Sequence, residues 1–181
     1  MISTVLRVPP HAVLRSARRR AAPLYHDRMT RSLLLLLTFL VSVMAADLPT
    51  KKYLNLAAIK TMVAAAEQEA QHRNVHVTIV VVDESGNLLF LQKADGVSLN
   101  TIQFAQKKAR YAAIYGRPSA VAADSLKNGD LGVLVNPDSF PNRGGVPIKM
   151  DGITIGAMAC SGAASEVDEA IAQAGIDALL K

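Results

Sequence analysis

The segment Gly144–Glu166, GGVPIKMDGITIGAMACSGAASE, concentrates the residue types that most often do chemistry. Cys160 and Ser161 stand side by side ahead of a glycine, which could mark a nucleophile or a phosphate cradle. A nucleophile elbow follows the pattern GxSxG, which would need glycine at Ala159 and Ala163. The phosphate-binding patterns GxGxxG and GxxxxGK[ST] are also absent. We therefore interpret the segment as a structural feature and not as a catalytic motif.

Histidine chemistry is limited as well. His72 and His76 are the two histidines of residues 47–181, and both precede the glycine-rich segment, so Ser161 has no base downstream of it. Their spacing of four would place them on one helix face, but Asn74 is expected to end the helix between them. A shared metal site is therefore not expected. The single cysteine excludes an intrachain disulfide, and in an apolar strand it is expected to be an inert thiol.

The elements that position these residues alternate between helical and strand patterns. A helix is expected over 54–73 with Asn55 as its N-cap, and a second over 98–115, capped by Ser98 or Asn100 and ended by Gly116. A third helix is expected from Ser165, its N-cap, to residue 180. Strands are expected at 75–82, 88–92, 146–150 and 153–160, and a short helix at 118–124.

The strands are joined as hairpins. The segment DESGN supplies the first turn, and Asp151-Gly152 gives the second, which is a strong short hairpin signal. The order α-β-β-α-β-β-α predicts a mixed α/β protein of the α+β class, with helices packed on an antiparallel sheet. The thin strand 156–160 and the alanine-rich first helix offer flat surfaces, so we also predict a homo-oligomer.

The net charge of +5 belongs to the N-terminal part of the chain. Residues 1–46 contain seven Arg and one acid, whereas residues 47–181 contain thirteen Lys or Arg and fourteen Asp or Glu. The second part therefore lacks the basic surface expected of a nucleic-acid-binding protein.

Residues 29–46 have the order of a secretory signal peptide. Arg31 precedes an apolar run over 33–43, and Ala45 and Ala46 offer a cleavage site. The run is shorter than the roughly 20 residues that span a bilayer, so no stable membrane span is expected. We interpret 1–28 as an upstream extension or disordered leader, and 47–181 as the mature, secreted or periplasmic domain. An organelle transit peptide is the alternative, because 1–28 is rich in Arg and poor in acids.

Four motifs then occur in order: VVDESGNLL, KKARYAA, GGVPIKMDGITIGAMACSGA and DEAIAQAG. Together they resemble the GlcG/HbpS family of small haem-binding proteins over about residues 53–181. The resemblance implies a profilin-like sandwich of helices and sheet, homo-oligomers and haem binding. For some members it also implies haem degradation or supply of a redox signal to a sensor-protein partner.

Within that resemblance, Tyr111 is the candidate axial ligand of haem iron, because tyrosine can ligate ferric haem. Here the chain departs from many relatives, which have a small hydroxyl residue at this position. Arg110 is expected to favour the phenolate. The further candidates share a place near that position or near the haem edge: Lys107 and Lys108 for the propionates, Phe104 for apolar packing, Gly144 and Gly145 for close backbone approach, and His72.

Two alternatives to a secreted haem-binding protein stay open. The ligand could be a small metabolite, as the glycolate-operon relatives suggest, and the protein an accessory protein or enzyme. The function could also reside in an oligomeric scaffold and its partner surface.

Overall fold

The computed structural model describes residues 31–32 and 49–180. The chain divides into two compact units, Met1–Pro49 and Thr50–Lys181. Apart from residues 31–32, the predicted extension 1–28 and signal segment 29–46 lie outside the described residues. Within the described part of the chain, no helix is both long enough and apolar enough to cross a bilayer. All the elements below belong to the second unit.

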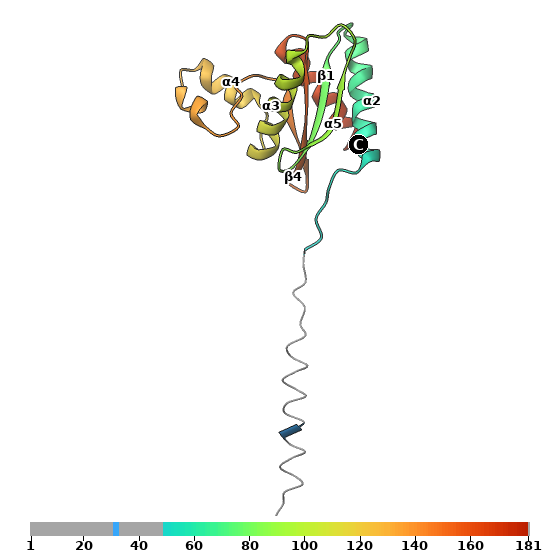
Figure 1. Ribbon diagram of the computed structural model, residues 1–181, viewed down its shortest axis with the longest axis vertical. Coiled ribbons are helices and arrows are strands. Elements are labelled where there is room, and N and C mark those ends of the chain that lie inside the picture. Colours follow the sequence, from blue (N-terminus) through green and yellow to red (C-terminus); the bar gives the residue numbers. More distant parts are fainter. Residues whose placement is uncertain (1–30, 33–48, 181) are drawn as a thin grey trace, which may run out of the picture. The chain divides into compact units, whose positions relative to one another are not determined.

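The second unit is a four-stranded antiparallel sheet flanked by helices, as the sequence predicts (Figure 1). The strand order across the sheet is β2-β1-β4-β3. The elements, in chain order, are α2 (Leu56–His72), β1 (Thr78–Asp83), β2 (Leu88–Lys93), α3 (Asn100–Tyr115), α4 (Ala120–Lys127), the 3-10 helix η1 (Leu131–Val135), β3 (Gly145–Met150), β4 (Ile153–Ser161) and α5 (Ser165–Leu179).

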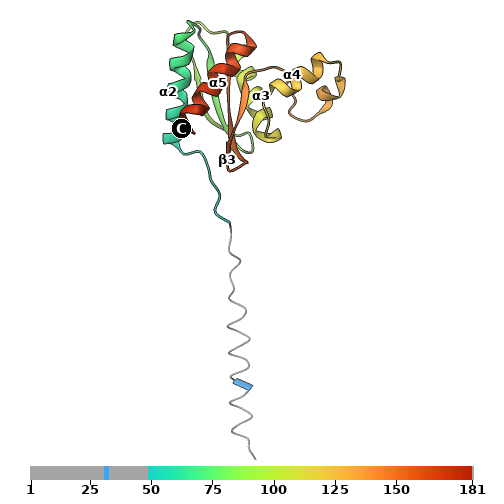
Figure 2. The same cartoon turned by 180° about the vertical axis from the view of Figure 1, so that it is seen from behind.

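The two faces of the sheet carry side chains of different size, because neighbouring residues of a strand point to opposite faces. Ile79 and Val81 of β1 join the core beneath α2 and α5, whereas Val80 and Val82 join the cluster beneath α3. Alanines of β4 and α3 fill most of that second cluster. Figures 1 and 2 show the result, with α2 and α5 on one face of the sheet and α3 on the other.

The glycines of the segment Gly144–Glu166 allow this close packing. A Cβ on Gly145 would lie 2.2 Å from the carbonyl oxygen of Lys108 in α3, and one on Gly156 would lie 2.4 Å from the carbonyl oxygen of Val82. Asp151 and Gly152 both have positive φ, as a tight hairpin turn requires. The interpretation of the segment as a small-residue hairpin is therefore confirmed.

Three expectations about local structure need correction. No side chain caps α3, since Leu99 is its N-cap residue and neither Ser98 nor Asn100 bonds to a free amide there. Ser165 does not cap α5, because it is the first residue of the helix and Ala164 is the N-cap residue; the Ser165 hydroxyl bonds to Asn142 at 2.9 Å. The predicted oligomer surface 156–160 is a central strand buried between helices, so it is not available for subunit packing. The homo-oligomer itself stays a prediction.

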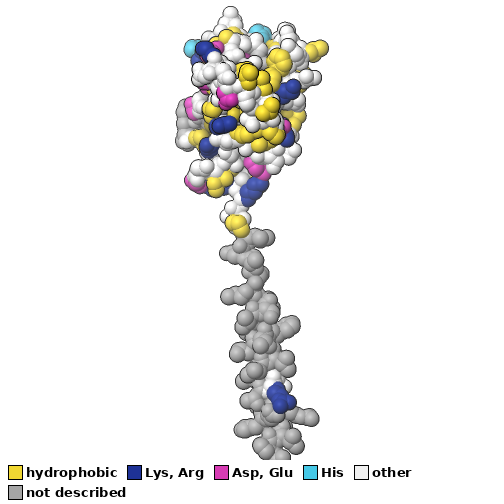
Figure 3. Space-filling model, turned by 90° about the vertical axis from the view of Figure 1, so that its left-hand side faces the viewer, with side chains coloured by type: hydrophobic (Ala, Val, Ile, Leu, Met, Phe, Trp, Pro, Cys, Tyr) yellow, Lys and Arg dark blue, Asp and Glu magenta, His cyan; other side chains and the backbone are white. Residues whose placement is uncertain are grey.

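The segment between α3 and β3 forms an arm made of α4 and η1. Hydrophobic side chains gather on the end of the domain that carries it (Figure 3), and Leu131, Leu134 and Val135 are exposed there. The arm is fastened to the body by Arg143, which bonds Asp124 of α4 at 2.9 Å and lies 3.6 Å from Glu169 of α5. Burial raises the pKa of Glu169, and the hydrogen bond that Arg143 donates to Asp124 raises the pKa of Arg143.

Candidate functional site

The turn after α2 places His76 at the mouth of two adjoining clefts. Asn74 adopts a left-handed φ of 56°, its amide bonds to the carbonyl of Gln71 at 2.9 Å, and the amide of Val75 bonds to the carbonyl of Ala70 at 3.0 Å. The helix therefore ends in a Schellman motif. The clefts measure about 360 and 480 Å³, and Asp95 lies with these turn residues in the lining of both. Apolar lining comes from residues that include Ala70, Val75, Val77, Ile79, Ala94 and Val97.

The backbone around His76 fixes which ring nitrogen is free. Nδ1 of His76 lies 3.2 Å from the carbonyl oxygen of Asp95. A carbonyl oxygen can only accept, so the neutral ring donates from Nδ1 and keeps its lone pair on Nε2. This is the arrangement of a metal-ligating histidine, in which the second nitrogen is oriented by a hydrogen bond.

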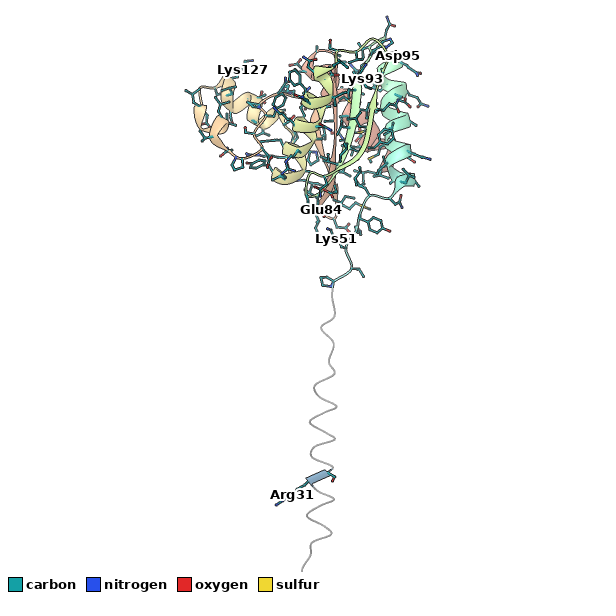
Figure 4. All side chains as sticks on the ribbon, viewed as in Figure 1. Arg31, Lys51, Glu84, Lys93, Asp95 and Lys127 are labelled. Atoms are coloured by element: carbon teal, nitrogen blue, oxygen red, sulfur yellow. The ribbon has the colours of Figure 1, made fainter. Side chains whose placement is uncertain are left out.

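Lys93 supports the segment that orients His76. Its ammonium donates to the carbonyls of Ala94 and Val97, at 3.0 Å each, on either side of Asp95. Figure 4 shows Lys93 and Asp95 together at one end of the sheet. The Lys93 ammonium is therefore hydrogen-bonded to backbone carbonyls. The lining of the two clefts contains the acids Glu67 and Asp95, but no Lys or Arg.

Tyr111 lies elsewhere, beneath the arm. Its side chain is 0% exposed and stacks on Tyr115 with ring centroids 4.6 Å apart. Its hydroxyl accepts a hydrogen bond from Nε of Arg117 at 3.0 Å, and Ala122 and Val133 complete the cluster. The phenol therefore contacts a cation, but one that the sequence interpretation did not consider.

Arg110 does not contact Tyr111, because adjacent helix residues point in different directions. It binds Asp138 through Nε at 2.6 Å and Nη2 at 3.3 Å, and this hydrogen bond raises the pKa of Arg110. The expectation that Arg110 acts on the Tyr111 phenol is therefore wrong. Lys107 and Phe104 both face Phe140, with the Lys107 ammonium 5.6 Å from its ring and the two aromatic centroids 5.4 Å apart.

Lys108 is buried, and its expected contact with haem propionates is wrong for this structure. Its ammonium lies 2.9 Å from Oδ2 of Asp168 and 3.1 Å from the carbonyl oxygen of Cys160. The lysine side chain is 2% exposed and the aspartate side chain 3%. Gly144 packs against the same group, since a Cβ there would lie 2.9 Å from the Lys108 ammonium. Gly144 and Gly145 therefore admit protein atoms, and not a ligand, to the backbone.

The remaining two candidates are His72 and Cys160. His72 is exposed, with Nδ1 4.0 Å from a carboxylate oxygen of Glu69. Cys160 is fully buried, and burial raises the pKa of its thiol, so it is an inert core residue, as predicted. Among the described residues, no group of three or more His, Cys, Asp and Glu could hold a metal ion.

His76 is the residue that sequence reasoning undervalued, because it was assigned to the strand and not to the turn before it.

The family model described as haem degrading protein HbpS-like matches residues 54–177. This chain belongs to the HbpS-like family. Protein GlcG of Escherichia coli is 34% identical to this HbpS-like chain over 112 residues, covering 62% of this chain and 84% of GlcG. Both the family and the mixed α/β fold inferred from the sequence are thereby confirmed.

Solved structures of HbpS-like relatives share the fold. Protein ORFY of Klebsiella pneumoniae superposes with a TM-score of 0.68 at 28% identity, covering 76% of this chain and 97% of ORFY. The PduOC:haem complex superposes with a TM-score of 0.65 at 27% identity, covering 70% of this chain and 95% of that chain. Haem is therefore a ligand of at least one structural relative.

Proposed function

We propose that this HbpS-like chain binds ferric haem in the paired clefts, with Nε2 of His76 as an axial ligand. The observation that carries the proposal is the hydrogen bond between Nδ1 of His76 and the carbonyl of Asp95, which leaves Nε2 free. Histidine is one of the four side chains that ordinarily ligate haem iron. The haem complex of PduOC supports haem as the bound molecule.

The cleft lining fits an apolar macrocycle with two charged edges. Val77 and Ile79 are buried at its floor, and Ala70 and Val75 line its wall. The clefts carry acids and no free cation, so haem carboxylates would stay in water at the cleft mouth. Bound haem would supply a redox-active iron, while the protein would supply the ligand nitrogen and exclude water from the macrocycle.

Replacing His76 separates this proposal from ligation by Tyr111. His76→Ala should lower the affinity for haem at least about 10-fold and change the Soret band. Removing a residue that only orients a metal ligand already lowers metal affinity by about 10-fold or more. Tyr111→Phe should leave both unchanged, because it removes only a buried hydroxyl bonded to Arg117. Haem titration of both variants, followed by absorbance, makes the comparison.

The reverse result would assign the iron to Tyr111, which stays the alternative ligand. A wild type without any Soret change would contradict haem binding and leave a small-metabolite ligand or an oligomeric scaffold. Haem degradation and a sensor-protein partner stay predictions, and so do the haem contacts of His72, Lys107 and Arg110.

We also infer export, with processing after Ala45 or Ala46. The support is the basic, apolar and small-residue order of residues 31–46. Intact mass of the exported protein should correspond to a chain beginning at residue 46 or 47. A mature N-terminus within 1–28, or failure to leave the cytosol, would contradict secretion.

A further inference from the structure

A third cleft, of about 280 Å³, lies between β2 and α3. It is at the Leu88 end of β2, whereas the His76 clefts are at the Lys93 end. It is lined by Val82, Gly86, Leu88, Gln106, Lys107 and Arg110. The cleft exists because α3 packs mainly over β1, β4 and β3, so the edge strand β2 is left largely uncovered on this face. Figure 4 shows Glu84, in the turn before β2, at the opposite end of the sheet from Lys93 and Asp95.

The cleft has an apolar floor and a cationic rim. Val82 is buried in the floor, and Leu88 at its side is 49% exposed although it is a large apolar residue. Arg110 forms one end, with its stem against Gly86, where a Cβ would lie 2.8 Å from Cγ of Arg110. The position of the guanidinium is set by two hydrogen bonds to Asp138.

Lys107 supplies the charge that a ligand could use. Among the described residues it forms no ion pair, and its ammonium lies over the Phe140 ring. The acids near this end already have partners, since Lys51 binds Glu84, Arg110 binds Asp138, and the amides of Ser85 and Asn87 bind Asp83. Since Lys107 lines the cleft, a carboxylate bound there would be within reach of an ammonium that has no acidic partner among the described residues.

We propose that this cleft binds an amphiphilic monocarboxylate, with its alkyl chain on Val82 and Leu88 and its carboxylate at Lys107. The volume lies just below the range of about 300–1,000 Å³ of drug-sized sites, which suits a single medium-length chain. The site is distinct from the His76 clefts, because the two lie at opposite ends of a strand of six residues, roughly 17 Å apart along it.

Calorimetric titration with decanoate tests the site. Wild type should bind one decanoate, and decanamide, which lacks the charge, should bind about 10-fold more weakly, because it cannot accept the charge-assisted hydrogen bond that a carboxylate accepts from the Lys107 ammonium. Lys107→Ala should show the same loss. Lys60→Ala, an exposed lysine on α2, should match wild type.

Two further measurements keep the result unambiguous. Decanoate should shift the amide resonances of Gly86 and Leu88, and Lys107→Gln should repeat the loss if the alanine variant is poorly folded. His76→Ala should bind decanoate like wild type, so failure of the haem proposal would not affect this one. The proposal is overturned if wild type does not bind decanoate, if Lys107 variants bind equally well, or if the shifts appear around His76.

Discussion

Lys108→Met should lower the free energy of unfolding by about 3–5 kcal/mol, because it leaves the buried Asp168 carboxylate without its cation. The lysine comes from α3 and the aspartate from α5, and these helices pack on opposite faces of the sheet. One ion pair therefore links three layers of the domain. The carbonyl of Cys160 also loses the donor that it has from Lys108.

Urea denaturation of three variants measures this effect. Lys107→Met changes the adjacent residue, which is not part of the ion pair, and should cost less than about 0.5 kcal/mol. The double variant Lys108→Met/Asp168→Leu should recover much of the loss, since replacing both members of a buried pair by apolar residues is often neutral. A cost for Lys108→Met no larger than for Lys107→Met would contradict a structural role for the pair.

Tyr111→Ala should cost about 3–5 kcal/mol and loosen the arm of α4 and η1, because it removes a fully buried aromatic side chain. The ring is the centre of a small cluster with Ala122 of α4 and Val133 of η1, so its loss removes the contacts that join the arm to α3. Stacking on Tyr115 is lost as well.

Hydrogen exchange across residues 120–135, together with urea denaturation, would show both effects. Ile114→Ala is the matched control, since Ile114 lies on the same helix but is 41% exposed, and it should cost about 1 kcal/mol or less. Unchanged exchange in the arm of Tyr111→Ala would show that Arg143 and the two hydrogen bonds between Ser119 and Gly145 hold the arm without the tyrosine.

The fold could be predicted from the sequence because its determinants are local. Each determinant acts within a few residues. They are the β-branched run around Val80, the Asp151-Gly152 turn, and the N-cap Asn55, whose side chain accepts a hydrogen bond from the amide of Ala58 at 2.8 Å. The small residues of β4 also indicated a close approach, although they could not show whether protein or ligand makes it.

The site was harder to predict than the fold, because its contacts are between residues that are distant in the sequence. The sequence places Arg110 next to Tyr111, but a helix turns adjacent side chains apart, and the partner of Tyr111 is Arg117. Lys108 looks like one of three surface cations until Asp168, sixty residues later, is placed beside it. Likewise, the role of His76 depends on the carbonyl of Asp95, which carries no sequence signal.

Imidazole rescue of His76→Gly is the most direct measurement of the central claim, that Nε2 of His76 ligates haem iron. The glycine variant opens space for a free imidazole at the ligand position. If the claim is right, ferric haem added to the variant shows an altered Soret band, and millimolar imidazole restores the wild-type spectrum and affinity. A variant that binds haem with the wild-type spectrum before imidazole is added would contradict it.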